Sequence, residues 1–428
     1  MIKYFTLFSL VFGACAASPK PAPATLQYQA KTMRKSAEHA PEIKSASKTV
    51  STQTERFENW KQRFIKQAIS KGYAEDLVRN TIAPAIIDPK ALDRNEKQAE
   101  FSRPIWSYVD GVKSTARING GMEKISMHGQ LYEGIKSRYG VNKEILTAIW
   151  GLESSYGKFL GDHDIINALS TFAFEGRRSK FGTAQLYGIL DMLARGDIRR
   201  EQLTGSWAGA MGMTQFIPTT FRDYAIDYNS NGNKDLWEDT GDALASTAHY
   251  LNRFGWRPEE PVLTEIVLPK GFDFGLSDGT KRTIAGWTSL GVRPISGKNW
   301  PKDALSLEAK LLVPAGSNGP VFLSFKNFDV IKKYNNSTAY AMGIHVLAES
   351  FKGNRAILKD WPRDDKPLSL TDKENLQIAL TRQGFNTGGV DGKIGPNSRR
   401  AIRAWQHANG YPANAYVEQK LLKVILGK

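Results

Sequence analysis

The fold of this chain is constrained most by residues 145–161, which have the sequence ILTAIWGLESSYGKFLG. Apolar side chains recur there at helical spacing, at Ile145, Ala148, Ile149 and Leu152. This spacing predicts a helix with one apolar face that packs into a core. Asn142 is suited to cap the start of the helix, and Gly157 and Gly161 are expected to end it.

Glu153 lies at the end of this predicted helix, one residue after Leu152. Burial of a carboxyl group raises its pKa and favours the protonated form at neutral pH. A general acid needs such a group. Glu153 is therefore a candidate general acid, and the alternative is an ordinary solvated glutamate at the end of a helix.

Charge and cysteine content limit the classes of partner and site. The 428 residues carry a net charge of +15, which indicates an anionic partner such as nucleic acid, an acidic cell-wall polymer or a membrane surface. The hydrophobic content of 41% allows a large core in two or three domains. The single cysteine, Cys15, excludes disulfides within the chain and metal sites built from cysteine clusters.

The first 18 residues are typical of a targeting segment with a short apolar run. Residues 12–15, FGAC, resemble a bacterial lipobox, although Phe12 stands where leucine is usual. In that case Cys15 would be acylated and become the mature N-terminus. Residues 14–16 also fit an ordinary signal cleavage site. Both alternatives predict an exported protein, which argues against a nucleic-acid partner.

The remaining sequence divides by composition. Residues 19–53 are rich in Pro, Ala, Ser, Thr and Lys and are expected to form a disordered tether. Residues 54–361 are predicted to form a mainly α domain, with a small mixed α/β insert between Pro261 and Pro314. Residues 362–368 are expected to be a linker to a final module, 369–428. Helices are predicted at 132–139, 145–153, 184–195, 243–254 and 339–350.

Three further motifs carry candidate binding groups. Residues 205–218 are rich in glycine and contain Ser206 and Gln215, which could bond sugar hydroxyls, although packing alone explains the glycines. The pair Arg177 and Arg178 could meet a substrate carboxylate or form a solvated face. Residues 334–340 gather aromatic and amide groups suited to sugars, or else cap a helix; the candidates there are Tyr334, Asn335 and Tyr340.

A separate motif, DYNSNGNKDLWE, matches the spacing of a calcium-binding EF-hand loop. Gly232 stands at the sixth position, where the loop turns. Neutral asparagines at the third and fifth positions predict modest affinity, and the alternative is a turn that holds no ion. The candidate ligands are Asp227, Asn229, Asn231, Asn233, Asp235 and Glu238.

Five of these stretches occur in the order found in the membrane-bound lytic transglycosylase B family, which this chain resembles. They are AIWGLESSYGKFLG, FAFEGRR, GSWAGAMGMTQFIPTTF, DYNSNGNKDLW and YNNSTAYAMGIHVLA. The resemblance implies a lysozyme-like helical catalytic domain with Glu153 as the catalytic acid. It also implies that Ser206, Gln215, Tyr334 and Tyr340 line a glycan cleft. Asp242 could close an extended calcium loop in place of Glu238.

Residues 369–428 resemble the peptidoglycan-binding domain type 1, a three-helix module. Apolar residues recur at helical spacing on each side of the tight loop at 391–396. Asn414 and Ala415 stand where the family has Asp-Gly after the second helix. The alternative is a basic helical bundle that only packs on the enzyme.

These resemblances imply a periplasmic, monomeric enzyme that cleaves peptidoglycan strands and is attached to the outer membrane if Cys15 is lipidated. Glu153 would act first as acid and then as base, giving 1,6-anhydromuramyl ends, with no cofactor required and calcium at most structural. Asp162 and Asp164 are close in sequence, so a water-using muramidase with two carboxylates is an alternative. A non-catalytic peptidoglycan-binding scaffold is another. Nucleic acid is not expected as a partner.

Overall fold

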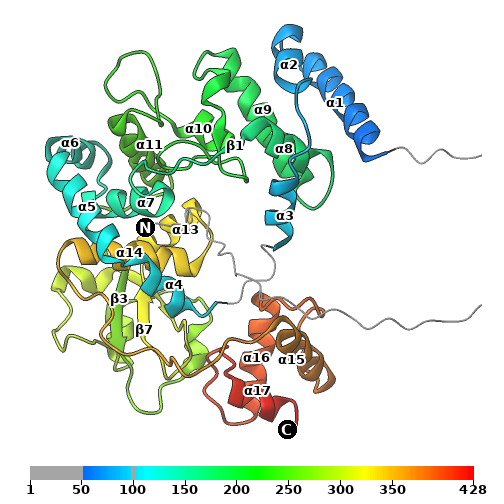
Figure 1. Ribbon diagram of the computed structural model, residues 1–428. Helices are drawn as coiled ribbons and strands as arrows, with labels where there is room; N and C mark the ends of the chain where they lie inside the picture. The colour runs from blue at the N-terminus through cyan, green and yellow to red at the C-terminus, as the bar shows by residue number, and fades with distance from the viewer. Residues whose placement is uncertain (1–51, 98–102) are drawn as a thin grey trace, which may run out of the picture.

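The computed structural model describes residues 52–97 and 103–428. The targeting segment, Cys15 and nearly all of the expected tether lie outside these residues. Within them, no helix is both long and apolar enough to cross a membrane. The expected mainly α fold, with a small mixed insert and a helical C-terminal module, is confirmed (Figure 1).

Helices form most of the body that precedes the insert. Thr52 begins the first of them with a capping box, in which it accepts from the backbone N–H of Glu55 and the Glu55 side chain accepts in return. The helices are α1 (Gln53–Ser70), α2 (Glu75–Ile82), α3 (Pro89–Lys97), α4 (Ile105–Val112), α5 (Thr115–Met127), α6 (Gly129–Tyr139), α7 (Lys143–Ser154), α8 (Ile165–Phe174), α9 (Ser179–Ala194), α10 (Pro218–Tyr224) and α11 (Thr240–Arg253).

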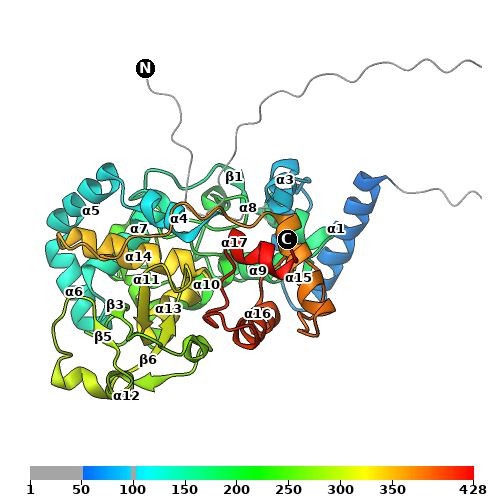
Figure 2. The same ribbon diagram turned by 90° about the horizontal axis from the view of Figure 1, so that it is seen from below.

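Helix α7 is the centre of the body, with α5, α11 and α14 (Thr338–Phe351) packed around it (Figures 1 and 2). The expectation of a single apolar face was wrong, because every residue from Ile145 to Ser154 is buried. The expected end at Glu153 is one residue early, because α7 extends to Ser154. Ser155, rather than the expected Gly157, leaves the helix in the left-handed conformation, at φ 50°.

Two short strands lie between the helices that follow α7 in sequence. Strand β1 (His163–Asp164) pairs antiparallel with β2 (Thr204–Gly205). Helices α8 and α9 lie between these strands in sequence and pack against each other. The expected helix at 184–195 is therefore longer at its start, because α9 begins at Ser179.

The insert is a five-stranded antiparallel sheet in the order β4-β6-β7-β3-β5. Its elements are β3 (Leu263–Val267), β4 (Arg282–Thr283), α12 (Ile284–Ser289), β5 (Arg293–Pro294), β6 (Glu308–Leu312) and β7 (Val321–Ser324). The sheet has its own cluster of buried side chains around Trp287 and Leu323. It extends beyond the expected limit at Pro314, because β7 pairs with both β3 and β6. Helices α13 (Lys326–Tyr334) and α14 then return to the body.

The C-terminal module contains α15 (Leu370–Arg382), α16 (Pro396–Ala408) and α17 (Gln419–Ile425) around a separate core. Leu368, assigned above to the linker, belongs to that core.

Two buried glutamines fix the two turns of the module. Gln377 of α15 accepts hydrogen bonds from the backbone N–H groups of Asp391 and Gly392 and donates to the Asp391 side chain. Gln406 of α16 accepts from the N–H of Ala415 and donates to the Asn414 side chain. Each helix therefore holds the turn that follows it.

Candidate active site

Glu153 is buried at the C-terminal end of α7, with only 3% of its surface exposed. The hydroxyl of Tyr340, from α14, donates a hydrogen bond to Glu153 Oε1 at 2.6 Å. Burial raises the pKa of Glu153 to about 8, against the lowering effect of the Tyr340 hydrogen bond. The carboxyl group is therefore largely protonated at neutral pH, which is the state that a general acid needs.

Three tyrosines surround this carboxyl group. Burial raises the pKa values of Tyr108, Tyr334 and Tyr340, and the negative charge of an ionised Glu153 raises them further. Their hydroxyls therefore stay protonated and available as hydrogen-bond donors. Sequence reasoning missed Tyr108, because an aromatic residue on an apolar helix face looks like any core residue.

The residues that follow Glu153 form a turn with a strained backbone. Ser155 and Tyr156 both have positive φ, at 50° and 63°, which costs energy for residues with a Cβ. The Tyr156 hydroxyl donates to the carbonyl of Arg117 at 2.6 Å. Ser154 donates to the carbonyl of Met213 and accepts from the N–H of Gly157. These bonds hold the turn and join α7 to the glycine-rich motif at 205–218.

The side chains of Ser206 and Gln215 are both engaged in hydrogen bonds to backbone groups. Ser206 Oγ accepts from the N–H of Ala210 at 3.0 Å, and Gln215 Nε2 donates to the carbonyls of Leu160 and Gly212. Both side chains are buried. Their role toward sugars stays a prediction, and their contacts here fix the shape of the motif.

Close packing explains the glycine at the start of this motif. A Cβ on Gly161, which has φ +99°, would lie 2.1 Å from the carbonyl carbon of Gly205. A Cβ on Gly205 would lie 2.1 Å from the carbonyl oxygen of Ala210. The segment that leaves α7 and the glycine-rich motif therefore touch backbone to backbone.

The residues of 334–340 separate into two roles. Ser337 caps α14 by accepting from the N–H of Tyr340 at 3.2 Å, so the helix-cap interpretation holds for part of the motif. Tyr334 donates its hydroxyl to the carbonyl of Thr214. Asn335 is half-buried in the turn between α13 and α14. Tyr334 thus reaches the glycine-rich motif, while Tyr340 reaches Glu153.

Arg177 and Arg178 differ in their surroundings. Arg177 is exposed. The guanidinium of Arg178 lies 5.1–5.5 Å from the ring centres of Phe172, Phe181 and Trp207. Burial, and then the charge of Arg177, lowers the pKa of Arg178. The Nη1 atom of Arg178 is buried and has no hydrogen-bond partner among the described residues. Arg178 is therefore held in place against the motif that contains Trp207.

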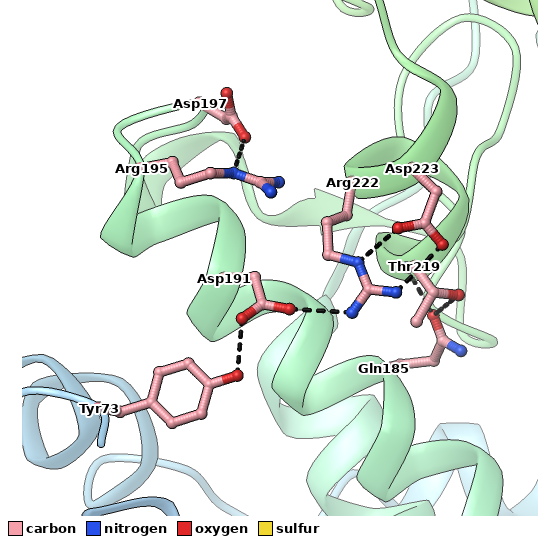
Figure 3. Close-up of polar contacts among 8 residues, drawn as sticks. All are labelled: Tyr73, Gln185, Asp191, Arg195, Asp197, Thr219, Arg222 and Asp223. Carbon is pink, nitrogen blue, oxygen red and sulfur yellow. Dashed lines mark hydrogen bonds and ion pairs between the residues drawn. The ribbon is translucent and has the colours of Figure 1, made fainter. Parts of the chain in front are cut away.

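A polar network fixes α9 against α10, which begins where the glycine-rich motif ends (Figure 3). Arg222 of α10 donates to Asp191 of α9 at 2.9 Å, and Tyr73 donates to the other oxygen of Asp191 at 2.6 Å. Gln185 accepts from both the backbone N–H and the hydroxyl of Thr219. These contacts fix the C-terminal end of the motif.

The loop predicted to bind calcium is organised by its own oxygen atoms. Asp227 accepts from the N–H groups of Asn231 and Gly232, and Asp235 accepts from those of Trp237 and Glu238. The oxygen-only donor set is of the type that Ca²⁺ prefers. Within residues 52–97 and 103–428, however, no group of three His, Cys, Asp or Glu side chains is arranged to hold a metal ion.

Asp242, expected as an alternative closing ligand, is completely buried. Its two carboxylate oxygens accept from the N–H groups of Tyr228 and Asp235 and so join the two ends of the loop. Burial raises its pKa, and the charges of Asp239 and Asp227 raise it further. This concentration of negative charge fits a cation. Glu238, the other closing candidate, is exposed, and the roles of Asn229 and Asn233 as ligands stay predictions.

Two protein-family models match the chain. The transglycosylase SLT domain matches residues 56–349, which is more than half of the sequence. The putative peptidoglycan binding domain matches residues 371–425. A curated relative, the membrane-bound lytic murein transglycosylase B of Escherichia coli K12, is 33% identical over 215 residues. That match covers 50% of this chain and 57% of the relative, so it spans little more than half the relative's length.

Solved structures are similar over most of the chain. SltB3 from Pseudomonas aeruginosa, in complex with NAG-anhNAM-pentapeptide, is 41% identical with a TM-score of 0.83, covering 86% of this chain and 99% of that one. SLT35 from Escherichia coli, in complex with calcium, is 27% identical with a TM-score of 0.60, covering 69% and 93%. Both likenesses support the helical fold described above.

Proposed function

Because the chain belongs to the transglycosylase SLT domain family, we propose that it is a lytic transglycosylase that cleaves peptidoglycan between N-acetylmuramic acid and N-acetylglucosamine. The observation that carries the proposal is Glu153, a buried carboxyl group with a raised pKa beside the Tyr340 hydroxyl. The solved relative SltB3 was crystallised in complex with NAG-anhNAM-pentapeptide. That ligand carries an anhydromuramyl group, which is the kind of product end expected here.

The proposed reaction uses one carboxyl group twice. Glu153 donates its proton to the oxygen that bridges the two sugars, and the bond from that oxygen to muramyl C1 breaks. The muramyl acetamido oxygen stabilises the positive charge that develops at C1. The muramyl C6 hydroxyl then attacks C1, and the Glu153 carboxylate takes the hydroxyl proton. The result is a 1,6-anhydromuramyl end and a re-protonated glutamic acid, with no water consumed.

The surroundings of Asp162 and Asp164 favour this one-carboxylate route over hydrolysis. The side chain of Asp162 is 86% exposed and lies 3.9 Å from His163. Asp164 caps α8 and forms an ion pair with Arg200. Among the described residues, burial and Tyr340 are the causes that shift the pKa of Glu153, and neither aspartate is one of them.

The products of a sacculus digest test the proposal against the muramidase alternative. We expect muropeptides whose muramyl ends lack one water relative to reducing ends, measured by mass spectrometry of digested sacculi. Reducing ends as the main product would replace transglycosylation by hydrolysis. No release of soluble muropeptides by the folded enzyme would favour the non-catalytic scaffold.

The pH dependence of cleavage should report Glu153. Because the protonated acid is the active form, kcat/KM should be level below the pKa of about 8 and fall about tenfold per pH unit above it. The Tyr340 hydrogen bond lowers that pKa, so Tyr340→Phe should move the falling limb to higher pH. A pH series of kcat/KM on soluble glycan fragments measures the falling limb of the parent and that of the variant. A limb that stays in place in the variant would contradict the assigned contact.

We further propose that residues 54–361 form the catalytic domain and residues 369–428 bind peptidoglycan as a second site. The family model that matches the C-terminal module supports this division. An N-terminal targeting segment would place a monomeric enzyme in the periplasm, or on the outer membrane if Cys15 is lipidated. Linked binding sites raise the effective concentration of the enzyme at the wall.

We propose that the loop at 227–238 binds a structural calcium ion. Its support is the oxygen donor set, the buried negative charge at Asp242 and the calcium complex of the relative SLT35. Excess calcium should raise the melting temperature. A free calcium concentration of about 100 times the Kd stabilises the native state by about 2.7 kcal/mol. Magnesium is the control, and its smaller, more rigid coordination predicts a smaller shift. Scanning calorimetry without any calcium-dependent shift up to millimolar concentrations would reduce the loop to a turn.

A further inference from the structure

The C-terminal module makes hydrogen bonds to the insert and to the expected linker. Asp365, in the expected linker, accepts hydrogen bonds from the Tyr416 hydroxyl and from the N–H of Gln419. Arg403 of α16 donates to the carbonyl of Ser277 in the insert at 2.9 Å. Figures 1 and 2 show the module beside the insert in both views.

The loop at 315–318, which precedes β7, also lies against the module. Gly316 has φ +70°, and a Cβ there would lie 2.9 Å from the ring of Tyr416. The absence of a side chain therefore allows the backbone of this loop to lie against the tyrosine ring. The insert and the module meet at this point without filling all the space between them.

A hollow of about 240 Å³ remains between the loop and the connection from α16 to α17. Its walls come from both units. The insert contributes the loop at 315–318, which includes Asn318, and the module contributes Tyr411, Asn414 and Lys420. Drug-sized ligands occupy sites of about 300–1,000 Å³, so this hollow suits a smaller group, such as one sugar ring.

The hollow contains a side-chain amide with a hydrogen-bond donor that is free among the described residues, and an aromatic ring that is partly exposed. Asn414 is only 8% exposed, and its Oδ1 accepts from Gln406 and from the N–H of Tyr416. Its Nδ2 donates no hydrogen bond to any described residue. Tyr411 is stacked on Trp405 and remains 39% exposed. An apolar surface at Leu421 and Val424 lies beside these groups.

We propose that this hollow binds an N-acetylated sugar of the glycan strand and that the insert supplies half of the site. Amide groups at Asn318 and Asn414 match the acetamido group, and the exposed tyrosine ring matches the apolar face of a sugar. The inference rests on the proposed function, because it takes peptidoglycan as the substrate. It adds that wall binding needs a residue outside the module.

Because the module contacts the insert and the expected linker, a sugar in the hollow and a bond at Glu153 would be held at a fixed separation. The glycan strand would then contact the protein at two sites, the hollow and Glu153, and the insert would be the element that connects them.

Binding to purified sacculi by the full-length chain tests the composite site. Glu153→Gln is included in every sample, so that the wall is not digested during sedimentation. In that background we expect Asn318→Ala to weaken binding about three- to tenfold, as the loss of one or two hydrogen bonds predicts. Tyr411→Ala should weaken it at least as much. The matched control is Asn299→Ala, another exposed asparagine of the insert that does not line the hollow.

The outcomes separate this inference from the proposed function. Weaker binding by Asn318→Ala, with binding by Asn299→Ala equal to the parent, supports the composite site. Equal binding by Asn318→Ala and Asn299→Ala overturns it, while binding by the parent still leaves the module as a wall-binding unit. A parent chain that does not sediment with sacculi ends both proposals. Circular dichroism checks that Tyr411→Ala keeps its helices.

Discussion

Glu153→Gln should fold normally and lose glycan cleavage by at least about 10²–10⁴-fold, the contribution expected of a general acid. The amide keeps the shape of the side chain and can still meet the Tyr340 hydroxyl, but it has no proton acidic enough to transfer. The loss should appear in kcat, because the proton transfer occurs at the chemical step. Release of soluble muropeptides from sacculi measures it.

Glu144→Gln is the matched control for this change. Glu144 lies in the first turn of the same helix and undergoes the same chemical substitution. We expect it to cleave like the parent chain. If the Glu153 variant also cleaves like the parent, another group must protonate the bridging oxygen, and the mechanism proposed above is wrong.

Gly161→Ala should be the most damaging of the small substitutions for stability. Its Cβ would lie 2.1 Å from the backbone of Gly205, and the positive φ of 99° disfavours any residue with a Cβ. Overpacking costs about 1–3 kcal/mol and a left-handed conformation about 1–2 kcal/mol. The free energy of unfolding should therefore fall by roughly 2–5 kcal/mol, which is a large part of a typical total. A drop in melting temperature of about 3–8 °C is expected for a domain of about 300 residues.

Gly72→Ala separates the two causes. Gly72 has nearly the same conformation, with φ +95°, but nothing lies within 4 Å of the position that a Cβ would take. Only the conformational cost should remain, so its melting temperature should fall much less. Equal losses in the two variants would mean that the contact with Gly205 relaxes easily and does not fix the glycine-rich motif.

The family and the mainly α fold could be predicted from the sequence, because five ordered motifs and helical periodicity are local signals. Glu153 was found in the same way, from its place at the end of an apolar helix. The partner that holds it was not predicted as a contact. Tyr340 lies 187 residues away, and no local pattern states which tyrosine will reach which carboxyl group.

Other misses have similar physical causes. Helix α7 is buried on all sides because α5, α6, α11 and α14 pack around it, and periodicity within one segment cannot report its neighbours. Asn142 stands at the N-cap position, as expected, yet its side chain makes no capping bond. Its Oδ1 is buried and finds no partner in the part of the chain that the structure describes. The strand β7 was missed because its four residues are all buried, which removes the alternation that marks a half-exposed strand.

The two glutamines of the C-terminal module give it the organisation of a tandem repeat. Gln377 and Gln406 each project from one helix and close the following turn through the same pair of amide contacts. The first turn has Gly392 at φ 66°, and the second has Ala415 at φ 60°, so the backbone path is the same where the residue differs. The helix with its turn is thus the unit of construction. In chimaeras between such modules, that unit is the piece to exchange, because its internal contacts move with it.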